Sequence, residues 1–269
     1  MPSAASIPQF NPARLRSYLF RLPLCTRIFL AIIVAFWFAS ISGGFQHWTT
    51  LTPEEVFAGG AYRLNTYPFL HRGIIHAVIN IIALTPLLER FESEHGTLVT
   101  LVLFTGPFST IPGVLYVLTN LFVLHTNTSA CGASIWTFLL FSAQCVIQSR
   151  TTPYLPLPIP SPYRIPTATL PLITMLLTWL FVPYTSLLGH ICGSAVGYLW
   201  GLGYIRFLAP PEKVLRWIET KFNPLARIPH YVSVDQKVFG RYGVLPSVAN
   251  GVPLSTLEAG GRRAGSGTV

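Results

Sequence analysis

The sequence predicts an all-α polytopic membrane protein, a bundle of six transmembrane helices followed by a cytosolic tail. Of its 269 residues, 51% are hydrophobic and only 10% are charged, and the mean hydropathy is +0.52. A soluble domain carries roughly 25% charged residues. Four stretches contain no Asp, Glu, Lys or Arg: residues 28–53, 73–88, 95–149 and 165–205. Helices built from such stretches can cross a hydrocarbon core of about 30 Å.

Six apolar spans can be drawn in chain order: 28–45, 73–88, 97–123, 133–149, 169–183 and 186–205. The second and fifth are short for a helix of about 20 residues, so we expect them to recruit flanking residues or to thin the bilayer locally. Pro107 and Pro112 predict a kink or a break in the third span. The first span follows a polar arm without a clear cleavage site and is expected to be a retained signal anchor.

The distribution of basic residues predicts the orientation. The segment before the first span carries basic residues and no acidic ones: Arg14, Arg16, Arg21 and Arg27. The positive-inside rule places this end in the cytosol, and six spans return the tail to the same side. The domains are then a cytosolic arm over 1–27, a six-helix domain over 28–205 and a cytosolic tail over 206–269. Residues 211–222 of the tail are expected to form an amphipathic helix on the cytosolic leaflet, and the remainder to be disordered.

Four polar residues fall at similar shallow depth below the far leaflet. His76 and Asn80 lie near the start of the second span and, four residues apart, share one helix face. Ser134 opens the fourth span, and His190 lies about one turn into the sixth. All three spans run inward, so the topology brings these residues together. Ionisable residues inside a membrane are functional candidates by default.

The residue types indicate acyl-transfer chemistry. A serine hydroxyl needs a base to become a nucleophile, and imidazole titrates near neutral pH. The predicted spans contain no Asp or Glu, so Ser134 and His190 would act as a dyad rather than a triad. The N-terminal backbone of the helix at Ser134, with His76 and Asn80, can supply an oxyanion hole. Small residues can let the helices pack closely: Gly132, Gly189, Gly193 and Gly197.

Each feature also has a purely structural interpretation. Ser134 alone could be a helix N-cap, His76 with Asn80 an interhelical hydrogen-bonded pair, and His190 a structural histidine. The conjunction at matched depth favours the catalytic interpretation. We expect no metal and no cofactor, because no HExxH pattern occurs. We also expect no nucleic-acid partner, because the orientation of the chain in the lipid bilayer accounts for its basic residues.

Three motifs resemble those of rhomboid intramembrane serine proteases: the run from His71 to His76 and Asn80, Gly132-Ala-Ser134, and Gly189-His190-Ile-Cys-Gly193. The resemblance covers about 28–205. It implies that Ser134 is the nucleophile and His190 the base, and that His76 and Asn80 support the oxyanion. His71 matches a further histidine of the family.

The sequence departs from the family pattern at two places. Ile135 replaces the last glycine of GxSG, and the Trp-Arg pair of the first loop is Tyr62-Arg63. The 63–71 run and the long tail resemble the fungal rhomboids of the Golgi and secretory pathway. That resemblance implies that the substrates are transmembrane proteins and that membrane-anchored transcription factor precursors are among them. A cytosolic AAA+ unfoldase could be recruited by the tail.

The predicted function is therefore an intramembrane serine endopeptidase with a Ser–His dyad. One alternative is a non-proteolytic rhomboid-like protein that binds client transmembrane helices for trafficking or extraction, which the unusual Ile135 and the long tail would suit. A channel or transporter is disfavoured, because charged pore residues and an internal repeat are missing. Asn127-Thr128-Ser129 is a glycosylation sequon close to the membrane, and its use is left open.

Overall fold

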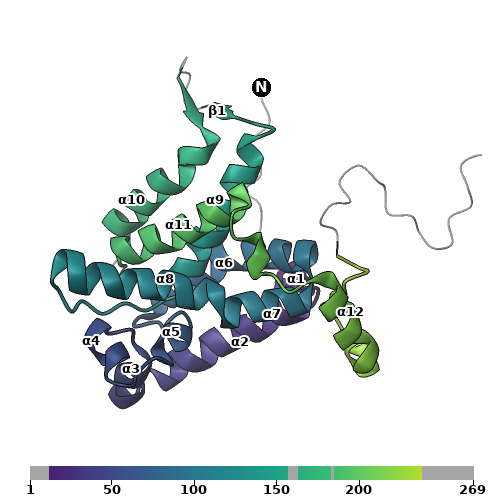
Figure 1. Cartoon of the computed structure of the whole chain (residues 1–269), viewed down its shortest axis with the longest axis horizontal. Helices are drawn as coiled ribbons and strands as arrows, with labels where there is room; N and C mark the ends of the chain where they lie inside the picture. Colours follow the sequence, from purple (N-terminus) through teal and green to yellow (C-terminus); the bar gives the residue numbers. More distant parts are fainter. Residues whose placement is uncertain (1–11, 157–162, 183–184, 238–269) are drawn as a thin grey trace, which may run out of the picture. The chain divides into compact units, whose positions relative to one another are not determined.

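A computed structural model describes residues 12–156, 163–182 and 185–237. This part of the chain is mostly helical (Figure 1). The longer helices are α1 Pro12–Leu19, α2 Leu24–Ala39, α6 Ile74–His95, α7 Thr97–Thr105, α8 Pro107–Leu118, α9 Ser134–Ser149, α10 Leu170–Phe181, α11 Leu187–Leu202 and α12 Glu212–Lys221. The predictions for residues 1–11 and for the tail beyond 237 lie outside the described ranges.

Short elements complete the described chain. They are α3 Gly43–Thr49, α4 Pro53–Phe57, α5 Arg63–Thr66, the π-helix η1 Thr119–Leu124, and the 3-10 turns η2 Thr167–Thr169, η3 Arg206–Leu208 and η4 Asn223–Arg227. Two strands, β1 Tyr154–Pro156 and β2 Arg164–Pro166, pair antiparallel with Leu155 opposite Ile165. The sequence did not predict this hairpin, because its apolar residues alternate with prolines, which leave few N–H groups for a ladder.

The six apolar segments of the sequence correspond to helices. Two helical segments, Ile74–His95 and Thr97–Leu124, are long and apolar enough to cross a membrane by length and composition. The others are shorter apolar helices: Leu24–Ala39, Ser134–Ser149, Thr167–Phe181 and Leu187–Leu202. The expected break in the third segment is confirmed: α7 ends at Thr105, and α8 begins at Pro107 after Gly106.

An aromatic cluster joins three helices beneath the start of α9. The ring of Trp136 lies 5.6 Å from that of Phe29 in α2, 4.9 Å from Phe69 and 5.4 Å from Phe104 in α7. Its indole N–H donates to the Ser109 hydroxyl at 3.1 Å. The pair with Phe29 is stacked and the other two are edge-to-face, and aromatic pairs of both kinds stabilise beyond the burial of their area. The cluster therefore fixes the first turn of α9 in the core.

Helix α11 packs more extensively against α9 than any other helix pair. Glycines on α11 make this contact a backbone contact. A Cβ added to Gly193 would lie 2.4 Å from the carbonyl oxygen of Ile135, one on Gly197 2.1 Å from that of Leu139, and one on Gly201 2.8 Å from that of Ala143. A side chain at these positions would push the helices apart, so the predicted packing role of Gly193 and Gly197 is supported by the geometry.

For Gly189 the described residues give no support to the predicted packing role. Among them, a Cβ added there would meet only Ser186 within 4 Å, at 3.5 Å and in its own helix turn. Gly201, which the sequence analysis did not single out, takes its place one turn beyond Gly197. The contact therefore extends deeper along α11 than the Gly189–Gly197 series indicated.

A buried carboxylate ties together the helix ends at the other side of the bundle. Glu92, fully buried in α6, accepts hydrogen bonds from the N–H groups of Cys25 and Thr26 at 2.8 and 2.7 Å. It also accepts from the hydroxyls of Thr26 and Thr97 at 2.8 and 2.7 Å. One side chain thus satisfies two N–H groups at the start of α2, which a helix terminus otherwise leaves unpaired, and it also binds the hydroxyl of the first residue of α7.

Gly197→Ala is expected to destabilise the protein by about 1–3 kcal/mol, because the added methyl group collides with backbone that cannot rotate away. Thermal unfolding in mild detergent measures the change. Gly189→Ala is the matched control on the same helix and should stay within about 0.5 kcal/mol of the parent. Equal unfolding temperatures for the two variants would contradict the backbone contact.

Candidate active site

Ser134 is half-buried at the first position of α9, directly after a turn that only glycine suits. Gly132 has φ +121°, a conformation that L side chains rarely adopt. A Cβ on Gly132 would lie 3.0 Å from Nε2 of His76 and 3.7 Å from Oγ of Ser134. The N–H of Gly132 donates to the carbonyl of Tyr67 at 2.9 Å. The turn thus brings the Ser134 hydroxyl close to the His76 ring.

His71 holds the same turn from the other side. Its Nε2 accepts the N–H of Ala133 at 3.2 Å, and its Nδ1 lies 3.1 Å from the carbonyl oxygen of Phe69. Because Nε2 accepts, the proton must sit on Nδ1 and be donated to Phe69. Burial, together with the neighbouring His76, lowers the pKa of His71 to about 3. His71 is therefore a neutral ring that orients the backbone one residue before Ser134.

His76 and Asn80 lie in the first turns of α6 and are both buried, as their spacing predicted. The His76 ring lies 5.0 Å from that of His71. Neither ring nitrogen of His76 has a hydrogen-bond partner among the described residues. Asn80 donates one amide hydrogen to the carbonyl of His76 at 2.8 Å. This bond fixes the Asn80 side chain against its own helix.

His190 is buried in the first turn of α11, where Ser186 caps the helix by accepting the N–H of Gly189 at 3.2 Å. Its ring stacks on Phe138, with centroids 4.3 Å apart and planes tilted by 35°. Both ring nitrogens of His190 lack a hydrogen-bond partner in the described part of the chain. A buried polar group without a partner calls for an explanation, and catalytic use is one.

Ser134 and His190, the predicted dyad, are not hydrogen-bonded to each other in this structure, since neither His190 nitrogen has a partner among the described residues. The two residues nevertheless lie on the paired helices α9 and α11. Phe138 stands one turn after Ser134, and its ring lies 4.3 Å from that of His190. The sequence analysis missed Phe138, although its spacing of four from Ser134 places both on one helix face.

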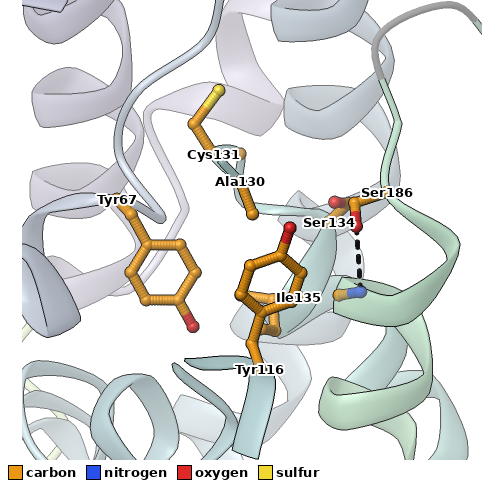
Figure 2. Close-up of a pocket in the computed structure, with 9 residues that line it drawn as sticks. Tyr67, Tyr116, Ala130, Cys131, Ser134, Ile135 and Ser186 are labelled. Atoms are coloured by element: carbon orange, nitrogen blue, oxygen red, sulfur yellow. Dashed lines mark hydrogen bonds between the residues drawn. The ribbon is translucent and has the colours of Figure 1, made fainter. Parts of the chain in front are cut away.

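A small pocket opens at Ser134 (Figure 2). The pocket is lined by the loops that precede α6, α9 and α11 and by residues of α8, α9 and α11. The lining residues are Tyr67, Tyr116, Ala130, Cys131, Gly132, Ser134, Ile135, Ser186 and Gly189. The two tyrosine hydroxyls are engaged, Tyr67 with the carbonyl of Ser109 at 3.2 Å and Tyr116 with that of Thr128 at 2.9 Å. Neither tyrosine could be assigned from sequence, because only the packing of α8 against the loops brings them here.

Ile135, the departure from the family pattern, is accommodated by Gly193. Ile135 is buried, and its Cγ1 lies 3.0 Å from where a Gly193 Cβ would be. Its side chain therefore fills space that the α11 glycine leaves open. Cys131 also lines the pocket, but burial raises the pKa of its thiol, against a smaller opposing effect of Arg72. A protonated thiol is a poor nucleophile, so Ser134 is the better candidate.

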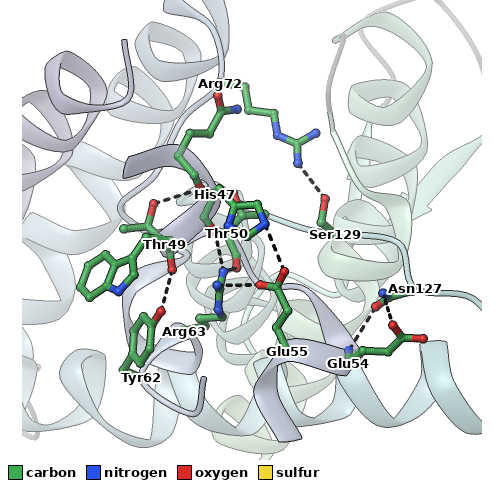
Figure 3. Close-up of polar contacts among 12 residues, drawn as sticks. His47, Thr49, Thr50, Glu54, Glu55, Tyr62, Arg63, Arg72, Asn127 and Ser129 are labelled. Carbon is green, nitrogen blue, oxygen red and sulfur yellow. Dashed lines mark hydrogen bonds and ion pairs between the residues drawn. The ribbon is translucent and has the colours of Figure 1, made fainter. Parts of the chain in front are cut away.

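The loop over residues 46–72 is folded and anchored by Arg63 (Figure 3). Arg63 is buried and donates to the carbonyls of His47 at 2.5 Å and Thr50 at 2.7 Å, and it pairs with Glu55 at 2.6 Å. Tyr62 stacks on Trp48 with centroids 4.7 Å apart. The Tyr-Arg pair therefore anchors this loop despite its departure from Trp-Arg.

A second set of contacts joins this loop to the segment before Ser134 (Figure 3). Asn127 donates to the Glu54 carboxylate at 2.8 Å and accepts the Glu54 N–H at 3.1 Å. Arg72 donates to the Ser129 hydroxyl at 2.7 Å. Leu51 and Ala130 exchange both backbone hydrogen bonds, at 3.0 and 2.9 Å. The sequon residue Asn127 thus contributes to the frame that positions the Ser134 turn.

Comparison with known proteins identifies the class. Residues 58–207 match the family model of the rhomboid domain. The chain is 50% identical to rhomboid-type serine protease B of Aspergillus fumigatus, over 98% of this chain and 94% of that protein. It is 48% identical to rhomboid-type serine protease 2 of Neurospora crassa, over 97% of each chain. The protein of that name from Saccharomyces cerevisiae is 30% identical over 78% of this chain and 82% of its own length.

The chain therefore belongs to the rhomboid family, a class of integral membrane proteins. It is a serine endopeptidase of the rhomboid type.

Gly132→Ala is expected to abolish labelling by a serine-directed fluorophosphonate, because the new methyl group would strain the turn and displace His76. Gly73→Ala is the control, since a Cβ there meets no described residue within 4 Å and φ is −138°. Labelling of purified protein in detergent gives the readout. Parent-like labelling of Gly132→Ala would contradict the close approach of His76.

His71→Gln is expected to remove part of the acid sensitivity of folding, because glutamine can accept the Ala133 N–H but does not titrate. The folded pKa of His71, about 3, lies below its ordinary value of 6.5. Its contribution to stability is therefore complete above pH 6.5 and is lost as the pH falls towards 3. Between pH 6.5 and 5 the parent should lose about 2 kcal/mol more than the variant. Chemical unfolding at both pH values measures this difference, and equal losses would contradict a neutral buried ring.

Proposed function

We propose that Ser134 is the nucleophile and His190 the general base of an intramembrane endopeptidase that cleaves transmembrane segments of membrane proteins. The observation that carries the proposal is the backbone contact of α9 with α11. This contact holds the helix that begins with Ser134 close to the helix that carries His190. Ser134 lines a pocket, and the buried His190 ring has no hydrogen-bond partner for either nitrogen in the described chain. Hydrogen bonds between catalytic groups are often long in unliganded enzymes and tighten when substrate binds.

The chemistry follows from these groups. His190 takes the proton of the Ser134 hydroxyl as the oxygen attacks the scissile carbonyl, and it then gives the proton to the leaving amine. Water next attacks the acyl-enzyme, and His190 serves again as the base. Packing of the imidazole against the Phe138 ring limits its reorientation, so less orientational entropy is lost at each step.

Three groups are proposed to stabilise the oxyanion: the backbone N–H of Ser134 and the side chains of His76 and Asn80. The N–H of Ser134 opens α9 and donates to no protein group in the described chain. His76 reaches the Ser134 turn, with its Nε2 near Gly132. Loss of one oxyanion donor typically costs about 2.7–4 kcal/mol of transition-state stabilisation.

The topology proposed for this activity has six spans, with both termini in the cytosol. The catalytic domain extends over 28–205 and the cytosolic tail over 206–269. The site would then lie just below the far, luminal leaflet of a Golgi or other secretory-pathway membrane. Membrane-anchored transcription factor precursors are proposed as substrates. The tail is proposed to recruit a cytosolic AAA+ unfoldase that extracts products.

Ser134→Ala and His190→Ala are each expected to lower cleavage of a single-span reporter in proteoliposomes by on the order of a thousandfold or more, since nucleophile and base act as one unit. Ser142→Ala is the control on the same helix, because the buried Ser142 hydroxyl has no partner in the described chain and its removal breaks no bond. Cleavage by both site variants at the parent rate would contradict the dyad. Intact co-purified client helices without fluorophosphonate labelling would instead favour the non-proteolytic alternative.

A further inference from the structure

The segment after α11 folds back as an ordered cap on the helix bundle. Its inward side is built around α12. Leu215 of α12 is buried in the same core as Val234. Glu219 accepts from the hydroxyl of Tyr231 at 2.8 Å and from the N–H of Val234 at 3.1 Å, and Glu212 pairs with Lys237. The acidic residues of α12 thus bind residues 228–237, which we call the strap.

The strap binds the bundle where two apolar helices begin. The carbonyl of His230 accepts the N–H of Leu24, the first residue of α2, at 2.9 Å. Val232 and Thr97, the first residue of α7, exchange two hydrogen bonds of 2.9 Å. Thr97 also donates to Glu92, so the strap is continuous with the buried network there. Helix ends of an integral membrane protein lie at the bilayer surface, so α12 is held at that level.

The outward side of α12 has a different composition. Lys213, Trp217 and Lys221 follow one another at intervals of four residues and therefore stand on one face. Trp217 is 64% exposed, and Val214 on the same face is 46% exposed. Phe207 and Phe222, just before and after the helix, are 79% and 57% exposed. The face thus combines Trp217 with two lysines, and an exposed phenylalanine lies on the chain at either end of the helix.

We propose that this face of α12, with Phe207 and Phe222, docks on the anionic leaflet of the bilayer in which the protein is embedded. Tryptophan places an apolar body and a polar N–H at a membrane interface, and lysines flanking it are attracted by anionic headgroups. Lysine is depleted from protein–protein interfaces, which argues against a protein partner or a second copy. The acidic residues of the cap do not oppose this attraction: Glu212 and Glu219 are engaged by the strap, and Asp235 pairs with Arg216 at 2.5 Å.

With docking, the cap would be attached at two places. The strap binds the first residues of α2 and α7, and α12 would bind lipid. Docking of α12 requires only that the chain lies in a membrane, and it does not depend on the Ser134–His190 dyad. A result that contradicts docking therefore does not contradict the dyad, and the reverse also holds.

The test reconstitutes the full chain into vesicles of phosphatidylcholine brominated high on the acyl chains, with or without phosphatidylserine. The fluorescence of Trp217 is obtained as the difference between the emission of the parent and that of Trp217→Phe. We expect bromine to quench this fluorescence, and to quench it more strongly when phosphatidylserine is present. Added salt should remove the extra quenching that phosphatidylserine causes. Trp179, 49% exposed on apolar α10, is the quenched reference, and buried Trp200 is the unquenched one.

The double variant Lys213→Gln/Lys221→Gln should lose the dependence on phosphatidylserine while keeping the parent unfolding temperature, which shows that the cap is still folded. Trp217 emission that bromine does not quench in either lipid would overturn the proposal. Shielding of Trp217 that appears only at high protein-to-lipid ratio would also overturn it, in favour of a second copy.

Discussion

The backbone contact between α9 and α11 is the constraint on which the site depends. Two helices can approach this closely only where side chains are missing, and α11 supplies Gly193, Gly197 and Gly201 at intervals of four. The contact fixes the distance between the helix that begins with Ser134 and the helix that carries His190. It also lets Ile135 occupy the space beside Gly193. The relative position of Ser134 and His190 is therefore a consequence of packing.

A second set of contacts fixes the turn from which the Ser134 side chain projects. The turn at Gly132 is held by backbone bonds to the loop over 46–72 and by the neutral ring of His71. That loop is in turn held by the buried guanidinium of Arg63. Charge-assisted hydrogen bonds to backbone carbonyls give a loop the order of a regular element. Ser134 thus lies between a packed helix at one side and a folded loop at the other.

The sequence was sufficient for features that follow from local composition. Apolar segments located the helices, and Pro107 located the break. Residue type and expected depth suggested Ser134, His76, Asn80 and His190 as site residues, and that assignment stays a prediction. It was insufficient where the feature depends on packing between distant segments. Gly189 and Gly201 have the same local pattern, yet among the described residues a Cβ would meet the backbone of another helix at Gly201 and not at Gly189. The roles of His71 and Tyr116 arise from contacts with residues far along the chain, which spacing cannot reveal.

The most direct measurement of the central claim is a structure of the protein in lipid after reaction with a fluorophosphonate. The account predicts phosphorus on Oγ of Ser134, a His190 ring nitrogen within hydrogen-bond distance of the adduct, and the phosphonyl oxygen directed to His76 and the N–H of Ser134. An adduct on another residue, or a His190 ring turned away from the adduct with α9 and α11 still in contact, would contradict it.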